Sequence, residues 1–317
     1  MYVQLLLVLI ISFFGTAILN IVFRFLGKRG RMGNLFQDVR GGTPRAIGIV
    51  PFLLISLFLP SGFNDLVLVI GICALIDDIV GRRKIGNIPI EIGQLARGIG
   101  MLCVIGFGYP IMGLSSILVA LFIQPINISD MQPGTTCNVV IMMSLLTIIL
   151  MLLLGTGPIE EIPAYYTPLI VLLACIGYAP LDYLGKIMMG EVGNHAFGVA
   201  LGICFFMLGG FIGTLILCIV SSFLIAYFRR FNLSKFLVSK LRISNPTYGD
   251  LMMDVLTGGG LGDFLRKIIL RDKQYEVKNP ILIVLGFRRL LYNPFAPNNS
   301  QHFSNSVKQN NSLSKYS

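Results

Sequence analysis

Two adjacent aspartates end an apolar run, and three cations follow within six residues. The chain reads Leu75-Ile76-Asp77-Asp78-Ile79-Val80-Gly81-Arg82-Arg83-Lys84. An ionisable group beside hydrocarbon needs a partner or a counter-ion. Asp77 and Asp78 are therefore either a helix end that faces water or a site for a divalent cation and a phosphate. Neighbouring helical residues point about 100° apart, so we expect one carboxylate to bind an ion and the other to act as a base or a positioning group.

Three more segments carry acids, amides, cations or glycines at the ends of apolar runs. They are Thr43-Pro44-Arg45 with Gly48, the stretch Asn127 to Gly134, and the stretch Met189 to Gly198. Magnesium binds through one or two carboxylates together with substrate phosphates, so acids from separate segments can compose one such site. Arg45 and the run from Arg82 to Lys84 would then neutralise phosphoryl oxygens.

Each of these residues also has a simpler interpretation. Arg45 and the run from Arg82 to Lys84 could only set the membrane orientation, the run by touching anionic lipid heads. Asn127 and Asp130 could cap a helix. His195 is expected to be a structural hydrogen-bonding group at a helix start.

Composition places the chain in a membrane. Hydrophobic residues make up 55% of it and charged residues 13%, whereas about a quarter of the residues in soluble proteins are charged. The six cysteines stand singly, mostly inside apolar runs, and are expected to be small buried hydrophobes rather than disulfides or zinc ligands. Only two histidines occur, which nearly excludes a histidine-based metal site or catalytic triad.

About nine transmembrane helices are expected, so the predicted fold class is an all-α polytopic membrane protein. The expected spans are residues 1–26, 46–60, 65–78, 98–107, 114–126, 139–154, 167–181 and two within 196–228 that meet at Gly209-Gly210. The fourth and fifth are joined at Gly108-Tyr109-Pro110. All 25 Lys and Arg residues then fall on one side, which the positive-inside rule identifies as the cytoplasm. We therefore expect an external N-terminus, a retained first span, a cytoplasmic active face and no nucleic-acid partner.

Three parts of the chain are expected. Residues 1–230 form the transmembrane domain, residues 231–292 form amphipathic pieces in the cytoplasm or on the membrane surface, and the Asn/Ser/Gln-rich residues 293–317 form a disordered tail. The apolar stretch Ile281 to Leu291 is short and interrupted by Arg288-Arg289, so it is not expected to span. No internal repeat is evident, so an inverted-repeat transporter has no support.

Residues 28 to 230 resemble the polyprenyl-phosphate N-acetylhexosamine-1-phosphate transferases, the superfamily of phospho-N-acetylmuramoyl-pentapeptide transferase. The P-R-x-x-G-I stretch of that family is matched by residues 44–49, and its D-D pair by Asp77-Asp78. Its M-G-D-x-G-S stretch is resembled by residues 189–194. Its N-x-x-D-G-x-D-G element is met in part, by Asn127, Asp130 and Gly134.

The resemblance implies that a polyprenyl phosphate attacks the β-phosphate of a UDP-amino sugar at a Mg²⁺ ion. The products would be a lipid diphosphate-sugar and UMP, for cell-envelope glycan synthesis at a bacterial plasma membrane. The resemblance assigns catalysis to Asp77 and Asp78, and metal binding to Glu191 and Asp130. It assigns substrate and phosphate binding to Arg45, Arg82, Lys84, Asn127, Gly190, Gly193 and Asn194. The partners would be polyprenyl phosphate, the UDP-amino sugar and membrane lipids, and a homodimer is compatible with the resemblance.

The chain departs from the family at several points. Met131 and Pro133 replace a glycine and an aspartate of the nucleotide-sugar element, and Glu191 stands where the family has an aspartate. The family's His-rich loop has no counterpart. Two other functions therefore stay open: an inactive homologue that binds a lipid-linked sugar or a partner protein, and an ion-coupled transporter. A transporter would need acids in mid-span, whereas the expected spans place every acid at a span end or in a loop.

Overall fold

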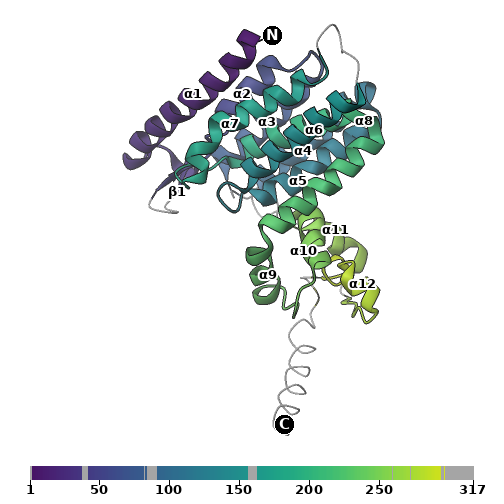
Figure 1. The fold of residues 1–317 in the computed structure, drawn as a ribbon. Coiled ribbons are helices and arrows are strands. Elements are labelled where there is room, and N and C mark those ends of the chain that lie inside the picture. The colour runs from purple at the N-terminus through teal and green to yellow at the C-terminus, as the bar shows by residue number, and fades with distance from the viewer. Residues whose placement is uncertain are drawn as a thin grey trace. The chain divides into compact units, whose positions relative to one another are not determined.

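The computed structural model describes residues 2–37, 42–81, 83, 91–155, 163–258, 260–271, 273–293 and 296. These residues are mostly helical (Figure 1). The chain forms two compact units, Met1–Ser221 and Ser222–Ser317. The sequence-based boundary at residue 230 lies shortly after the boundary between the two units. The predicted tail, residues 293–317, lies outside the described residues except for Asn293 and Ala296.

Eight helices, a short 3-10 helix and one short strand pair build the described part of the first unit, and the last of these helices continues past Ser221 into the second unit. The helices are α1 (Tyr2–Lys28), α2 (Ile49–Phe58), α3 (Phe63–Val80), α4 (Ile92–Met112), α5 (Ser115–Ser129), α6 (Thr135–Leu154), α7 (Tyr166–Tyr183) and α8 (Gly190–Phe228), and the 3-10 helix is η1 (Gly33–Leu35). Strand β1 (Phe36–Gln37) pairs antiparallel with β2 (Thr43–Pro44). Packing joins α3 to α4, α1 to α7, α6 to α7, and α4 to α5.

Five of these helices are long and apolar enough to cross a membrane. They are α1, α4, α6, α7 and α8. Helices α2 and α5 are apolar but shorter, and α3 carries three aspartates within its 18 residues. The chain is thus a helical membrane protein, and the finer expectation of nine spans goes beyond these five.

Helix α1 has the inside-out pattern of a membrane helix. Its polar residues Ser12, Thr16 and Asn20 are buried, whereas apolar residues such as Phe14 and Ile18 are 59% and 60% exposed. Ser12 Oγ donates a hydrogen bond to the Ala174 carbonyl of α7 at 2.6 Å. Small and polar residues mediate helix contacts in lipid, because burying apolar side chains away from equally apolar lipid tails gains no hydrophobic free energy. The exposed apolar face of α1 therefore fits a hydrocarbon surrounding.

The predicted break in the last apolar stretch is confirmed. Gly209 and Gly210 leave the helical conformation inside α8, and Gly210 has φ +57°. A Cβ on Gly213 would lie 3.2 Å from the Phe205 carbonyl oxygen, although eight residues of straight helix span about 12 Å. The chain therefore turns sharply at this glycine pair and separates residues 190–208 from residues 211–228.

The predicted joint at Gly108-Tyr109-Pro110 is wrong. Helix α4 continues through Pro110 and ends at Met112, and the turn falls at Gly113, which has φ +56°. A proline inside a membrane helix is tolerated when neighbouring groups satisfy the freed backbone. Positive φ, which glycine adopts without strain, marks the helix end here.

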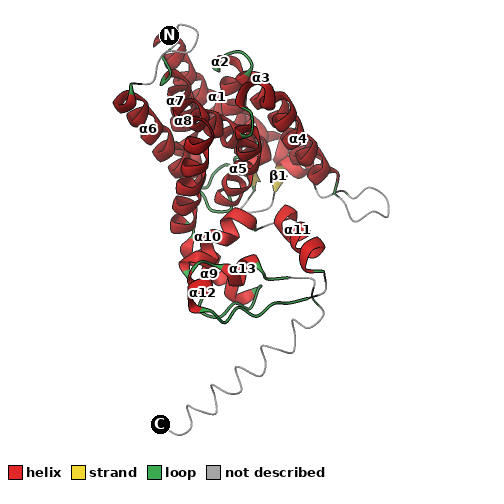
Figure 2. Cartoon of the chain, turned by 90° about the vertical axis from the view of Figure 1, so that its right-hand side faces the viewer, coloured by secondary structure: helices red, strands yellow, loops and turns green. Residues whose placement is uncertain are grey.

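The second unit is a group of short helices held by buried ion pairs. It contains α9 (Arg230–Ser239), α10 (Tyr248–Thr257), α11 (Gly260–Leu270), α12 (Pro280–Val284) and α13 (Phe287–Leu290), shown in Figure 2. The Arg289 Nε atom donates to Asp254 Oδ1 at 2.6 Å, and Arg288 pairs with Asp250 at 2.5 Å. The two arginines that interrupt the apolar stretch at 281–291 thus tie α13 to α10.

Candidate functional site

Asp78 holds the start of helix α8. Its side chain is fully buried in the last turn of α3. Its Oδ1 atom accepts a hydrogen bond from the Glu191 backbone N–H at 3.0 Å, and its Oδ2 atom accepts one from the Val192 N–H at 3.0 Å. The first N–H groups of a helix lack partners within the helix and favour negative charge. Asp78 therefore caps α8 from a helix 113 residues away in sequence.

Backbone contacts place Arg45 beside Asp78. The Met188 N–H donates to the Pro44 carbonyl at 2.9 Å, and the Gly48 N–H donates to the Met189 carbonyl at 3.1 Å. Arg45 Nε then lies 2.9 Å from Asp78 Oδ1 as an ion pair. The stretch 44–48 and the stretch 188–189 therefore form a single backbone joint.

Three glycines make this joint sterically possible. A Cβ on Gly48 would lie 2.6 Å from the Gly193 Cα atom, and one on Gly190 would lie 2.7 Å from both Asp78 Oδ2 and the Ala46 Cα atom. Gly190 also has φ +74°. The predicted substrate-binding residues Gly190 and Gly193 thus serve the packing of the joint in this structure.

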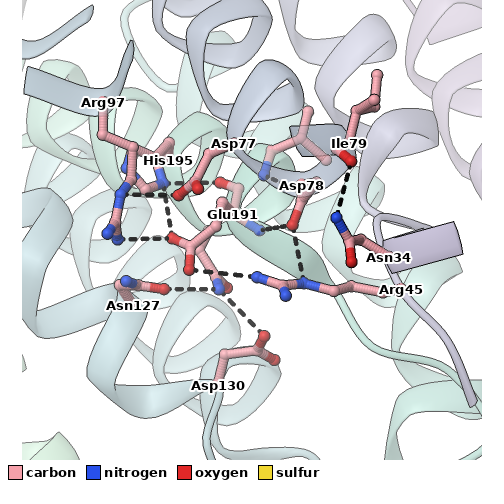
Figure 3. A network of polar contacts seen from close by, with 12 residues as sticks. Asn34, Arg45, Asp77, Asp78, Ile79, Arg97, Asn127, Asp130, Glu191 and His195 are labelled. Carbon is pink, nitrogen blue, oxygen red and sulfur yellow. Dashed lines mark hydrogen bonds and ion pairs between the residues drawn. The ribbon is translucent and has the colours of Figure 1, made fainter. Parts of the chain in front are cut away.

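Carboxylates and guanidiniums alternate from Asp78 to Asp77 (Figure 3). Arg45 Nη2 lies 3.5 Å from Glu191 Oε1, Arg97 Nη1 donates to Glu191 Oε2 at 3.2 Å, and Arg97 Nε lies 2.8 Å from Asp77 Oδ2. We call the five residues Asp78, Arg45, Glu191, Arg97 and Asp77 the alternating chain. The side chains of its last four members are between 11% and 23% exposed. They keep a small exposed fraction, whereas the Asp78 side chain has none.

A second polar group lies next to this chain (Figure 3). Asn194 Nδ2 donates to Asn127 Oδ1 at 3.2 Å and to Asp130 Oδ2 at 3.1 Å. Desolvation raises the pKa of Asp130 well above its usual value, and the nearby charge of Asp182 adds to this effect, while the hydrogen bond from Asn194 opposes it. The Asn194 Oδ1 atom is buried and has no hydrogen-bond partner among the described residues. This group therefore contains one buried acceptor with no donor among the described residues.

The structure brings most of the predicted site residues together. Arg45, Asp77, Asp78 and Glu191 share the alternating chain, and Asn127, Asp130 and Asn194 share the second group. The Asp130 carboxylate thus contacts the amide of Asn194 rather than an arginine of the alternating chain. Arg82 and Lys84 lie outside the described residues. His195 Nδ1 lies 2.7 Å from the Glu191 carbonyl oxygen, a contact within α8.

Sequence reasoning missed Arg97. It lies in α4, at a position that the expected spans 65–78 and 98–107 leave between them. Gly93, one turn earlier, lets Asp77 lie against α4, because a Cβ there would overlap with the Asp77 carboxylate. The available signal was spacing, since Gly93 and Arg97 are four residues apart and so share a helix face.

Asp182 was also missed. Its Oδ2 atom accepts hydrogen bonds from the Gly134 N–H at 3.0 Å and from Cys137 Sγ at 3.3 Å. Gly134 precedes α6 and cannot cap the helix with a side chain of its own, so Asp182 of α7 caps α6 from outside. An acid at the end of an apolar run, the signal that drew attention to Asp78, also applies to Asp182.

The donor set of the alternating chain fits a magnesium ion in part. Among the described residues, no three acidic, histidine or cysteine side chains stand close enough together to hold a metal. Asp77 and Glu191 nevertheless converge on one cation, the Arg97 guanidinium. Magnesium in phosphate-binding sites needs only one or two carboxylates, because substrate phosphates and water complete its shell. The pair Asp77 and Glu191 therefore fits the ion, whereas the oxygens of Asp78 are already occupied.

No protein-family model and no curated protein matches this chain.

Proposed function

We propose that the protein transfers a sugar 1-phosphate from a UDP-amino sugar to a polyprenyl phosphate. A phosphate oxygen of the lipid would form a bond to the β-phosphorus of the nucleotide sugar, and the bond from that phosphorus to the bridging oxygen would break. The products are a lipid diphosphate-sugar and UMP. The observation that carries the proposal is the alternating chain, which gathers Arg45, Asp77, Arg97 and Glu191 from four separate segments.

The two arginines supply the charge that such a reaction needs. Phosphoryl transfer depends mainly on positioning and on neutralising the phosphoryl oxygens. Arg45 and Arg97 are each about one-fifth exposed, and arginine forks match phosphate geometry. They would bind the diphosphate, while buried Asp78 holds Arg45 and the start of α8 in place.

The acids divide their roles by exposure. Asp78 is a positioning residue, because its oxygens are buried and engaged. Asp77 and Glu191 would face the reacting phosphates and hold Mg²⁺, which when bound would supply further positive charge to the diphosphate. Asn127, Asp130 and Asn194, which hydrogen-bond to one another beside the alternating chain, would line the pocket for the nucleotide sugar.

The membrane supplies the second substrate. A polyprenyl phosphate is confined to the bilayer, and holding two reactants together removes much of the entropic barrier. The apolar faces of helices such as α1 are exposed to the surroundings. We place the alternating chain at the cytoplasmic face of a bacterial plasma membrane, where the product would enter cell-envelope glycan synthesis.

An alternative is an inactive homologue that binds a lipid-linked sugar or a partner protein. One observation favours it: each carboxylate of the alternating chain already has a guanidinium partner. In an inactive homologue, the alternating chain would stabilise the fold, and the protein would catalyse no reaction.

A matched pair of variants tests the proposal. The purified protein is incubated with Mg²⁺, polyprenyl phosphate and a panel of UDP-sugars, and UMP is measured. Asp77→Asn should lower UMP formation about a hundredfold or more, while Asp65→Asn, the same change at an exposed position in the first turn of α3, should leave it unchanged. Absence of UMP with every sugar, together with saturable binding of a lipid-linked sugar, would support the inactive homologue instead.

A further inference from the structure

Arg97 bridges two carboxylates that come from different helices. Its Nε atom lies 2.8 Å from Asp77 Oδ2 of α3, and its Nη1 atom lies 3.2 Å from Glu191 Oε2 of α8. Figure 3 shows a dashed line from the guanidinium to each of the two acids. Glu191 also has a weaker contact with Arg45, at 3.5 Å, whereas Asp77 has no second ion pair among the described residues. Arg97 is therefore the main cation for this pair of acids.

A divalent cation would need the same two carboxylates. Magnesium requires carboxylate oxygens at about 2.0–2.1 Å, and the two that converge here already contact Arg97. Two carboxylates also repel one another unless a cation lies between them. One guanidinium meets this need with a single positive charge, so adding a second cation between the acids requires Arg97 to move away.

We infer that Arg97 is a resident cation that competes with a divalent cation for Asp77 and Glu191. In the protein alone, the arginine holds the pair and divalent cations bind weakly. Once displaced, its fork is free to bind a diphosphate. This inference rests on the proposed function only for the identity of the diphosphate, because the competition itself needs no substrate.

Manganese binding to the full-length protein in detergent measures the competition directly. Mn²⁺ serves as the probe, its free concentration is followed by electron paramagnetic resonance, and no nucleotide or lipid substrate is added. Arg97→Gln removes the charge but keeps a polar side chain. We expect it to lower the Kd for Mn²⁺ about tenfold or more, since both carboxylates lose their main cation.

Two further variants locate the effect. The double variant Arg97→Gln/Asp77→Asn should lose the gain, because one of the two ligands is gone. Arg97→Lys should lie between wild type and Arg97→Gln, because an ammonium lacks the rigid fork that bridges two carboxylates. Arg97→Lys keeps the positive charge, so it also provides the measurement if Arg97→Gln does not fold.

The inference is overturned if wild type and the Arg97 variants bind Mn²⁺ equally well, or if the gain survives the loss of Asp77. Its failure is distinguishable from failure of the proposed function. A gain in Mn²⁺ affinity without UMP formation under any condition would leave the competition standing and remove the transferase. Substrate-dependent UMP formation with no change in Mn²⁺ affinity would support the transferase and overturn the competition.

Discussion

Arginine–aspartate contacts occur in both units of the protein, but they are built differently. In the second unit Arg289 and Asp254 meet at 2.6 Å with side chains 2% and 6% exposed. In the alternating chain Arg97 is 23% exposed and divides its contacts between two acids, at 2.8 Å and 3.2 Å. A buried pair is held by its surroundings, whereas a shared and partly exposed guanidinium can be exchanged for another ligand. Similar residues thus serve stability in one place and, we propose, ligand binding in the other.

Removal of Arg289 should cause the largest loss of stability. Arg289→Gln leaves Asp254 buried without its cation, and loss of one partner of a buried pair costs about 3–5 kcal/mol. Hydrogen exchange of α10, followed by mass spectrometry, should accelerate accordingly. The control is Lys278→Gln, because the pair Lys278–Glu276 is 81% and 80% exposed and its loss should not alter exchange. Equal exchange in both variants would show that the buried pair adds no stability.

Removal of the Asp182 cap should cause an intermediate loss of stability. Asp182→Ala leaves the Gly134 N–H and the start of α6 without their acceptor, which costs about 1–3 kcal/mol. Faster hydrogen exchange at residues 134–138 and a lower thermal midpoint in detergent are expected. Asp65→Ala, at an exposed position in the first unit, is the matched control. An unchanged midpoint would mean that water replaces the carboxylate at little cost.

Removal of Arg97 should cost the least stability. Its side chain is 23% exposed, whereas that of Arg289 is 2% exposed, so Arg97→Gln should lower the thermal midpoint less than Arg289→Gln does. The same variant should show the gain in Mn²⁺ affinity described above. A destabilisation as large as that of Arg289→Gln would remove the distinction between the two kinds of arginine.

Much of the fold follows from apolar run length. Long apolar segments must form helices in a membrane, because the backbone has no other partners there, and the break at Gly209-Gly210 is visible as two adjacent glycines. The turn after α4 was misplaced because Pro110 looks like a helix end. In the structure Gly113, with its positive φ, ends the helix instead.

The convergence of Arg45, Asp77, Asp78 and Glu191 was also predictable, because each stands at the end of an apolar run. The direction of each side chain was not. Asp77 and Asp78 are neighbours in sequence, yet one is wholly buried and the other faces Arg97. Which of the two keeps some exposed surface depends on where α4 and α8 pack, and these contacts join residues far apart in sequence. Arg97 and Asp182 carry signals in the sequence, but their contacts with Asp77 and Glu191, and with Gly134, likewise come only from packing.

The joint between residues 44–48 and 188–193 has a consequence for how this protein can vary. No side chain separates the two backbones there, since Gly48, Gly190 and Gly193 touch their neighbours directly. A single methyl group at any of these positions would push Arg45 away from its acid without altering one charged residue. We therefore expect these three positions to accept no residue larger than glycine.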